Sequence, residues 1–184
     1  ERIDKEPTDY RDIYIKNGDG IDLRCGCSDI LIENITGQTE DDSVALTALK
    51  GRSETRFFVP EKGWDIHHIV IKNVMTRVLS GAQLRLLCAD GTRVHDVCAD
   101  TLVDTSPAQA WQTSVFLGYA ILAEYIRERT SVRGEMTNIS ISNVFSNSYR
   151  AILAGCALEN LRITNLYCRS GVRHAVTTEN IAEL

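Results

Sequence analysis

The sequence contains no uninterrupted run of about 18 apolar residues, so no membrane-spanning helix is expected. It also has no excess of basic residues, since 20 Lys and Arg stand against 25 Asp and Glu and the formal net charge is −5. We expect neither a membrane nor a nucleic-acid partner, because a nucleic-acid surface needs basic side chains to displace counterions from phosphates. Hydrophobic residues make up 43% and charged residues 24%, which is typical of a folded domain rather than a disordered chain.

Motifs that would indicate a cofactor are missing as well. We find no phosphate loop, dinucleotide fingerprint, nucleophile elbow or HExxH zinc motif. Cys25-Gly-Cys27 has the wrong spacing for a zinc knuckle, and no second cysteine pair stands nearby. We therefore expect no cofactor and no resident metal.

The chain contains six cysteines, an even number that would permit disulfides. A chain of this length does not need disulfides to stabilise its fold, so we favour six small buried hydrophobic side chains. Cysteine usage does not settle the cellular compartment.

The N-terminal residues contain neither an initiator Met nor the apolar core of a signal peptide. Either a signal has been removed or the chain is part of a longer protein. We favour the second reading, because strand-like sequence begins at residues 12–15 with nothing before it to cap a repeat array. We expect preceding coils of a longer chain, or an oligomeric partner, to cover this edge.

One pattern recurs along the chain: apolar, any, apolar, any, Asn or Asp, apolar. Its copies lie at residues 30–35, 69–74, 139–144 and 161–166, with a weaker copy at 92–97. The Asn or Asp positions (Asn34, Asn73, Asp96, Asn143 and Asn165) are successively 39, 23, 47 and 22 residues apart. We interpret 22–23 residues as one coil, 47 as two coils, and 39 as one coil with an insertion.

Alternating apolar residues predict a strand with one buried face, and Asn or Asp tolerates the bend that ends it. Each copy is followed by a second short apolar run, so two or three strands per coil are expected. The sequence therefore predicts an all-β, right-handed parallel β-helix forming a single domain over residues 1–184. We expect insertions at 50–62 and 119–135, with a short helix at 119–129. The alternatives are a doubly wound α/β fold and a β-sandwich. Most intervals between the copies are too short for the helices that the α/β fold requires.

Acidic residues occupy matching places in two consecutive coils. Asp19 and Asp22 begin one coil, and Asp41 and Asp42 stand 22 and 23 residues after Asp19. Stacking would place Asp19 about 4.8 Å from its counterpart. Carboxylates packed so closely repel, so their pKa values should separate, leaving one protonated beside one ionised. Glycoside hydrolysis needs such a pair.

The motifs Asn17-x-Asp19-Gly20-x-Asp22 and Asp41-Asp42-x-x-Ala45 resemble those of polygalacturonases, the glycoside hydrolase family 28 enzymes, from about residue 13 to 97. That family folds as a right-handed parallel β-helix and hydrolyses pectin with inversion. The resemblance implies that Asp41 is the general acid and that Asp19 and Asp42 activate the water. It also implies a polysaccharide substrate and a secreted or extracytoplasmic protein.

Substrate binding is assigned by the same resemblance to Asn17 and Arg85. Arg85 matches the first residue of the family's Arg-Ile-Lys motif, but Leu87 stands where the Lys is expected, and the family's Gly-His-Gly is absent. We expect Arg85 to reach the carboxyl groups and pair with an anionic sugar. For an inverting mechanism the carboxyls should lie roughly 6.5–9.5 Å apart.

Two other functions remain open at this point. The chain could be a catalytically inactive β-helix that serves as a glycan-binding, adhesin or spike module. It could also be a polysaccharide lyase whose aspartates bind Ca²⁺. Asp22 and Asp29 are expected only to end strands at turns, and the four histidines, which are scattered in sequence, to be surface or ladder residues: His67, His68, His95 and His174.

Overall fold

The computed structural model describes residues 18–50, 59–107, 109–118 and 128–178. Most of these residues lie in β-strands, and none of them lies in an α-helix. The strands are β1 (Ile21–Arg24), β2 (Ser28–Thr39), β3 (Val44–Ala48), β4 (Ile66–Val78), β5 (Ala82–Cys88), β6 (Val94–Asp104), β7 (Gln109–Leu117), β8 (Met136–Ser146), β9 (Ser148–Ala154), β10 (Glu159–Cys168) and β11 (His174–Thr178). A 3-10 turn occupies Pro60–Lys62. Within these ranges no helix is long and apolar enough to cross a membrane.

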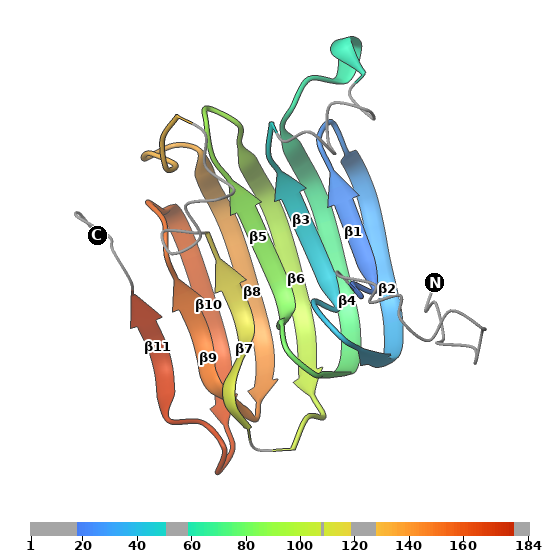
Figure 1. Ribbon diagram of the computed structural model, residues 1–184, viewed down its shortest axis with the longest axis vertical. Helices are drawn as coiled ribbons and strands as arrows, with labels where there is room; N and C mark the ends of the chain where they lie inside the picture. The colour runs from blue at the N-terminus through green and yellow to red at the C-terminus, as the bar shows by residue number, and fades with distance from the viewer. Residues whose placement is uncertain (1–17, 51–58, 108, 119–127, 179–184) are drawn as a thin grey trace, which may run out of the picture.

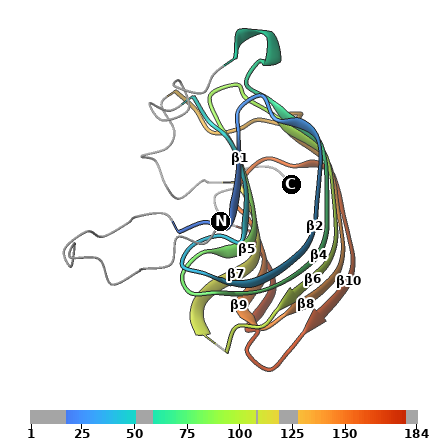
Figure 2. The ribbon, with the colours of Figure 1, turned by 90° about the vertical axis from the view of Figure 1, so that its right-hand side faces the viewer.

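The odd-numbered strands form one parallel sheet and the even-numbered strands form a second one. The odd sheet runs in the order β1-β3-β5-β7-β9-β11, and the even sheet places β2, β4, β6, β8 and β10 side by side in chain order. Figure 1 shows the chain rising through the odd strands in front and descending through the even strands behind while it advances from right to left. This is a right-handed parallel β-helix with two sheets per coil, as the repeat predicted, and Figure 2 shows its coils stacked along the axis.

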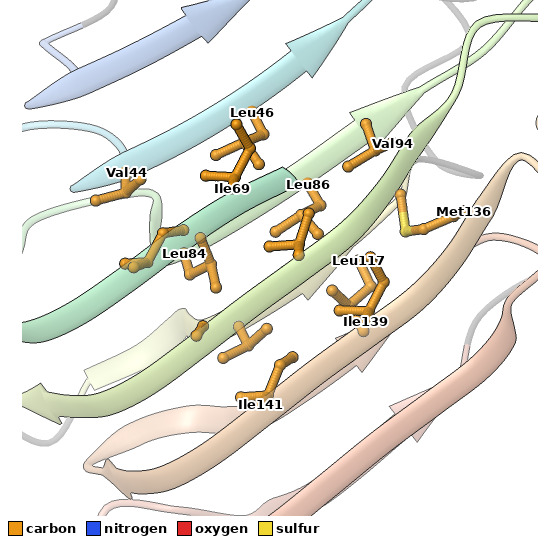
Figure 3. Close-up of a cluster of buried hydrophobic side chains, with 14 of the residues drawn as sticks. Val44, Leu46, Ile69, Leu84, Leu86, Val94, Leu117, Met136, Ile139 and Ile141 are labelled. Carbon is orange, nitrogen blue, oxygen red and sulfur yellow. The ribbon is translucent and has the colours of Figure 1, made fainter. Parts of the chain in front are cut away.

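The hydrophobic core fills the space between the two sheets. Inward residues of consecutive odd strands stack in register, for example Val44 on Leu84 and Leu46 on Leu86. Ile69 of β4 meets them from the even sheet (Figure 3), as does Ile71 of the same strand, and all of these side chains are completely buried. Branched aliphatic side chains suit this position, because they pack well on a pleated surface whose opposite face is covered.

The even strands are long because each bends without breaking, at residues with left-handed backbone. The predicted ladder exists: Asn34, Asn73, Asn143 and Asn165 have φ values from 54° to 60° at equivalent bends. The Nδ2 of Asn73 donates to the Oδ1 of Asn34 over 3.1 Å, and Asn165 bonds Asn143 in the same way over 2.9 Å. Asn tolerates this conformation better than most residues, so the left-handed backbone at each bend explains why Asn recurs at this position of the repeat.

The weak copy of the pattern was aligned wrongly with the others, because Asp96 does not lie opposite Asn73. Because β4 pairs Lys72 with Asp100 and Val74 with Leu102, the residue opposite Asn73 is Thr101, with φ 60°. Asp96 belongs to a second row of left-handed residues, five positions earlier in each strand. Its members are Asp29, His68, Asp96, Asn138 and Asn160.

The interpretation of the 47-residue interval as two coils was also wrong. Strand β6 pairs directly with β8, so one coil joins them, with β7 as its odd strand. The extra length lies after β7. The expected helix at 119–129 falls mostly on residues 119–127, outside the described ranges. Beyond them, the carboxylate of Asp90 accepts the main-chain N–H groups of Glu128 and Arg129, which ties this segment to the turn after β5. In the insertion at 50–62, residues 51–58 also lie outside the described ranges.

Among the described residues, Cys27, Cys88, Cys98, Cys156 and Cys168 are free thiols, and the thiol of Cys25 donates to the carbonyl oxygen of Leu49 over 3.0 Å. Cys88 and Cys156 are buried as expected, whereas Cys98 and Cys168 are exposed and Cys25 and Cys27 are half-buried. The expectation of six buried thiols was therefore right for two of them.

Candidate active site

The acidic residues gather at the corner where an even strand ends and an odd strand begins. Ile21, Val44 and Leu84 are stacked partners in β1, β3 and β5. Two residues earlier along each strand, the same stacking aligns Asp19 with Asp42. The ladder continues into this corner, because Gly20 N–H donates to the carbonyl oxygen of Asp42 over 2.8 Å. The sequence spacing of one coil thus becomes spatial proximity.

Asp19, Asp41 and Asp42 converge, as the spacing predicted. One carboxylate oxygen from each lies within 4.8 Å of the others. The main-chain N–H of Asp42 donates to Oδ1 of Asp19 over 2.9 Å, and Oδ1 of Asp42 accepts the N–H of Ala82 over 2.6 Å. This cluster is tighter than the roughly 6.5–9.5 Å expected of an inverting pair, because stacked coils are separated by only about 4.8 Å.

Arg85 of β5 reaches the same cluster. Its Nε lies 2.7 Å from Oδ2 of Asp42, and its NH2 lies 3.8 Å from Oδ2 of Asp19. Arg85 is aligned with Ala45 of β3, whose small side chain leaves room beside the acids. Only 8% of Arg85 and 2% of Asp42 is exposed, so this is a buried ion pair. The guanidinium is therefore engaged by the site's own carboxylates.

Burial dominates the electrostatics of the cluster. It raises the pKa of Asp19 to about 6 and that of Asp42 to about 7. The neighbouring carboxylates raise both pKa values further, and the charge of Arg85 opposes the shift. Removing a carboxylate from water disfavours its charged form, which is the cause of both shifts. Asp41 is less buried than Asp42, and no described residue donates a hydrogen bond to its carboxylate. The site therefore combines two carboxyl groups of raised pKa, both held by main-chain hydrogen bonds, with a third carboxyl group that no described residue holds.

Asp22 does not end a strand, contrary to expectation. It lies within β1, where it accepts a hydrogen bond from Thr47 over 3.0 Å and pairs with Arg24. Burial raises its pKa, and Arg24 opposes the shift. Asp29 does not end a strand either: it is the second residue of β2, at a left-handed bend with φ 59°.

A glycine that the sequence alone did not single out makes room for the acids. A Cβ on Gly81 would lie 2.3 Å from Oδ1 of Asp41 and 2.6 Å from Oδ1 of Asp42, closer than real contacts allow. Its signal in the sequence was the pair Gly81-Ala82, two small residues where the strand that carries Arg85 begins.

The other expected site residues are not part of this cluster. Asn17 lies outside the described ranges. Three histidines, His67, His68 and His95, gather instead at the starts of β4 and β6, and His174 lies in β11. Among the described residues none of the four contacts the acidic cluster.

Comparison of this chain with protein families, with curated proteins and with solved structures found no match.

Proposed function

We propose that this chain is a glycoside hydrolase of polygalacturonase type that hydrolyses an acidic, pectin-like polysaccharide outside the cytoplasm. The observation that carries the proposal is the convergence of Asp19, Asp41 and Asp42 around Arg85 at one corner of the β-helix. Glycoside hydrolysis requires closely placed carboxyls whose environments differ, and this corner provides them.

In this proposal Asp41 protonates the oxygen of the glycosidic bond, and Asp19 with Asp42 directs water to the anomeric carbon. Asp41 suits the acid because it is less buried than Asp42 and no described residue donates a hydrogen bond to its carboxyl group, so this group is free to face the substrate. Asp19 and Asp42 suit the base, since a carboxyl with a pKa of about 6 or 7 is a better proton acceptor near neutral pH than an ordinary one. Water gives up its proton to that base as its oxygen bonds to the sugar.

The buried cation favours hydrolysis over a Ca²⁺-dependent lyase. A calcium ion would need the same carboxylate oxygens that Arg85 approaches to 2.7 Å and 3.8 Å. Displacing the guanidinium would leave a buried charge without compensation.

A catalytically inactive glycan-binding, adhesin or spike module is the second candidate. It is favoured by Leu87 in place of the family Lys, by the missing Gly-His-Gly, and by the deep burial of Asp42. In that case the acids serve only to stabilise the corner.

The deciding experiment measures reducing-sugar release from polygalacturonate, esterified pectin and neutral glycans, comparing the intact chain with Asp41→Asn and with Glu33→Gln. Glu33 is an exposed acid on the even sheet, so its variant is the matched control. We expect release from the acidic polymer, a loss of about 10²–10⁴-fold in Asp41→Asn, and no change in the control. Circular dichroism verifies that both variants fold.

Two outcomes reject the hydrolase. Glycan binding without sugar release supports the inactive module, and an unsaturated product with its ultraviolet absorbance would indicate a lyase. Sugar release that survives Asp41→Asn would instead remove Asp41 from the mechanism. The anomeric configuration of the first product, followed by NMR, tests inversion separately, because the tight cluster leaves less room for water than inverting enzymes usually provide.

A further inference from the structure

The charge of Arg85 is committed to the acids of the corner and is not offered to a ligand. Its Nε lies 2.7 Å from Asp42, its NH2 lies 3.8 Å from Asp19, and only 8% of the residue is exposed. A polymer of acidic sugars needs cationic partners, because a carboxylate leaves water favourably only where its charge is compensated. Recognition of such a polymer therefore requires other basic side chains.

Charge is divided unequally along the axis of the β-helix. Residues 18–50 contain seven acidic and two basic side chains, whereas residues 147–178 contain four arginines and one acid. That acid is Glu159, which pairs with Arg133 over 3.4 Å. Figure 1 shows the two parts at opposite ends of the odd sheet, with β1 and β3 at one end and β9 and β11 at the other. An anionic polymer is therefore attracted to the coils of β9 and β11.

A row of stacked residues joins the acidic corner to this basic end. It begins at Ala82, whose N–H donates to Oδ1 of Asp42 over 2.6 Å. The register partners of Ala82 in the next odd strands are Thr113, Arg150 and His174. Neighbouring strands are about 4.8 Å apart, so Arg150 lies roughly 10 Å and His174 roughly 14 Å along the row from Ala82. A chain of sugars along this row would contact both the acids and the basic residues.

Tyr149 brings the basic side chains of this row together. The Cζ of Arg150 lies 5.8 Å from the centroid of its ring. The ring of His174 meets it edge-on, with centroids 5.2 Å apart, and the Nε2 of His174 lies 3.4 Å from the tyrosine hydroxyl. The main-chain N–H of Arg173 donates to the carbonyl oxygen of Tyr149 over 2.9 Å and so fixes the start of β11 against β9. Backbone pairing thus holds the three side chains in one place.

The chemistry of these side chains suits an anionic sugar. A guanidinium presents a planar fork that can bind a carboxylate through two parallel hydrogen bonds. The tyrosine hydroxyl and the imidazole nitrogen both donate and accept hydrogen bonds, as sugar hydroxyls require. Tyr149 and Arg150 are half-buried and His174 is exposed, so a ligand can reach them. Among the described residues no ion pair joins His174 or the adjacent Arg173 to an acid.

We propose that Tyr149, Arg150 and His174 form a subsite that binds a carboxylate-bearing sugar of the polysaccharide, two to three strands away from the acids that cleave it. The subsite rests on the proposed function, because an acidic polymer is the ligand that extends from the acids to this end. Binding so far from the reacting bond strengthens the attachment of substrate and transition state alike. Its loss therefore weakens binding and raises KM rather than slowing the chemical step.

The test measures the affinity of the intact chain for a hexamer of galacturonate by calorimetry. All proteins carry Asp41→Asn, so that hydrolysis does not consume the ligand. Arg150→Gln removes the cation, and Arg150→Lys keeps the charge without the planar fork. His174→Gln changes an exposed residue and so tests the subsite without disturbing the core. Arg162→Gln is the matched control, because it removes an exposed arginine of β10 on the even sheet.

We expect the affinity for the hexamer to fall at least about fivefold in Arg150→Gln and about two- to threefold in His174→Gln. Arg150→Lys should recover part of the loss, and Arg162→Gln should match the parent. The fully methyl-esterified hexamer, which has no charge, should bind weakly and equally to all variants. Absence of hexamer binding overturns the subsite, as does equally strong binding of the esterified hexamer. Equal losses in Arg150→Gln and Arg162→Gln also overturn it, since they would indicate attraction by net charge alone.

Hydrolysis by chains that retain Asp41 separates the subsite from the proposed function. Arg150→Gln should raise the KM for the hexamer far more than it changes kcat. Hydrolysis with an unchanged KM in this variant overturns the subsite and leaves the hydrolase standing. Hexamer binding that depends on Arg150 without sugar release supports the subsite and rejects the hydrolase.

Discussion

The main-chain N–H of Asp42 donates to Oδ1 of Asp19 over 2.9 Å, although 23 residues separate them in sequence. That number is one coil of the β-helix, so the repeat length itself brings the two acids together. The hydrogen bond also fixes which oxygen of Asp19 faces Arg85, since Oδ2 is the atom 3.8 Å from the guanidinium. A slip of one residue in the pairing of β1 with β3 would turn one of these acids to the other face of the sheet.

Burial of Asp19 and Asp42 predicts that stability falls as the pH rises. Their pKa values in the folded chain, about 6 and about 7, lie above the ordinary value of 3.8, so the folded state holds protons that the unfolded state releases. The stabilisation is complete below pH 3.8 and is lost as the pH rises through 6 to 7. We expect the urea midpoint to decline from pH 5 to pH 8.

Asp42→Asn should reduce this slope, because an amide does not titrate. At pH 5 Asp42 is mostly protonated, so the neutral amide should leave the stability there close to the parental value. Glu33→Gln, an exposed neutralisation, should keep the parental slope. An unchanged slope in Asp42→Asn would mean that Asp42 is ionised throughout this range.

Gly81→Ala should destabilise the corner by about 1–3 kcal/mol, the usual cost of inserting a methyl group where there is no space. The added Cβ would approach Oδ1 of Asp41 to 2.3 Å and the main-chain nitrogen of Asp42 to 2.8 Å, and the backbone cannot yield cheaply. Chemical denaturation measures the loss. Ser80→Ala is the neighbouring control, because Ser80 is exposed and its change adds no atom. Equal stability of the two variants would contradict the described packing.

Two variants of Asn73 can separate the contribution of the left-handed backbone from that of the hydrogen bond in the Asn ladder. Asn73→Ala should cost about 1–2 kcal/mol for the left-handed backbone and lose its hydrogen bond to Asn34. Asn73→Gly removes only the hydrogen bond, because glycine adopts φ 54° freely, so it should lie between the parent and Asn73→Ala. If Asn73→Gly is no more stable than Asn73→Ala in urea denaturation, backbone strain is not what selects asparagine here.

The sequence predicted the coil and the acidic cluster for the same reason. Alternating apolar residues define the strands, and parallel stacking turns equal positions in consecutive coils into neighbours, as with Asp19 and Asp42. The phase at Asp96 could not be predicted, because two rows of left-handed residues lie five positions apart and both accept Asn and Asp. In that coil Thr101 lies in the row of Asn73, and a threonine in a strand does not indicate a left-handed bend.

The histidine group was missed because sequence distance hides it. His67 and His95 are 28 residues apart, a coil length that differs from the predicted 22–23. Their contact depends on the register of β4 with β6, which the misplaced copy at Asp96 concealed. The position of His68 beside His67 depends further on a left-handed bend, which histidine adopts less often than asparagine.

Arg85 should control both the stability of the corner and its pH dependence. Its charge lowers the pKa of Asp19 and of Asp42, so Arg85→Gln should raise both values further. Above pH 7 the variant must either bury unpaired carboxylates or keep them protonated at a pH where they would ionise in water. We expect the free energy of unfolding to fall by about 3–5 kcal/mol there. Near pH 5 the same carboxyls are mostly protonated and the loss should be smaller.

Arg85→Lys is the matched variant, because it keeps the charge but lacks the planar group that reaches both acids. It should restore part of the stability at pH 8, measured by urea denaturation beside Arg85→Gln. A loss in Arg85→Gln that is equal at pH 5 and pH 8 would mean that Arg85 stabilises the corner through packing alone. In that case its contacts with Asp42 and Asp19 would not set their protonation, and the assignment of these acids as bases would lose its electrostatic support.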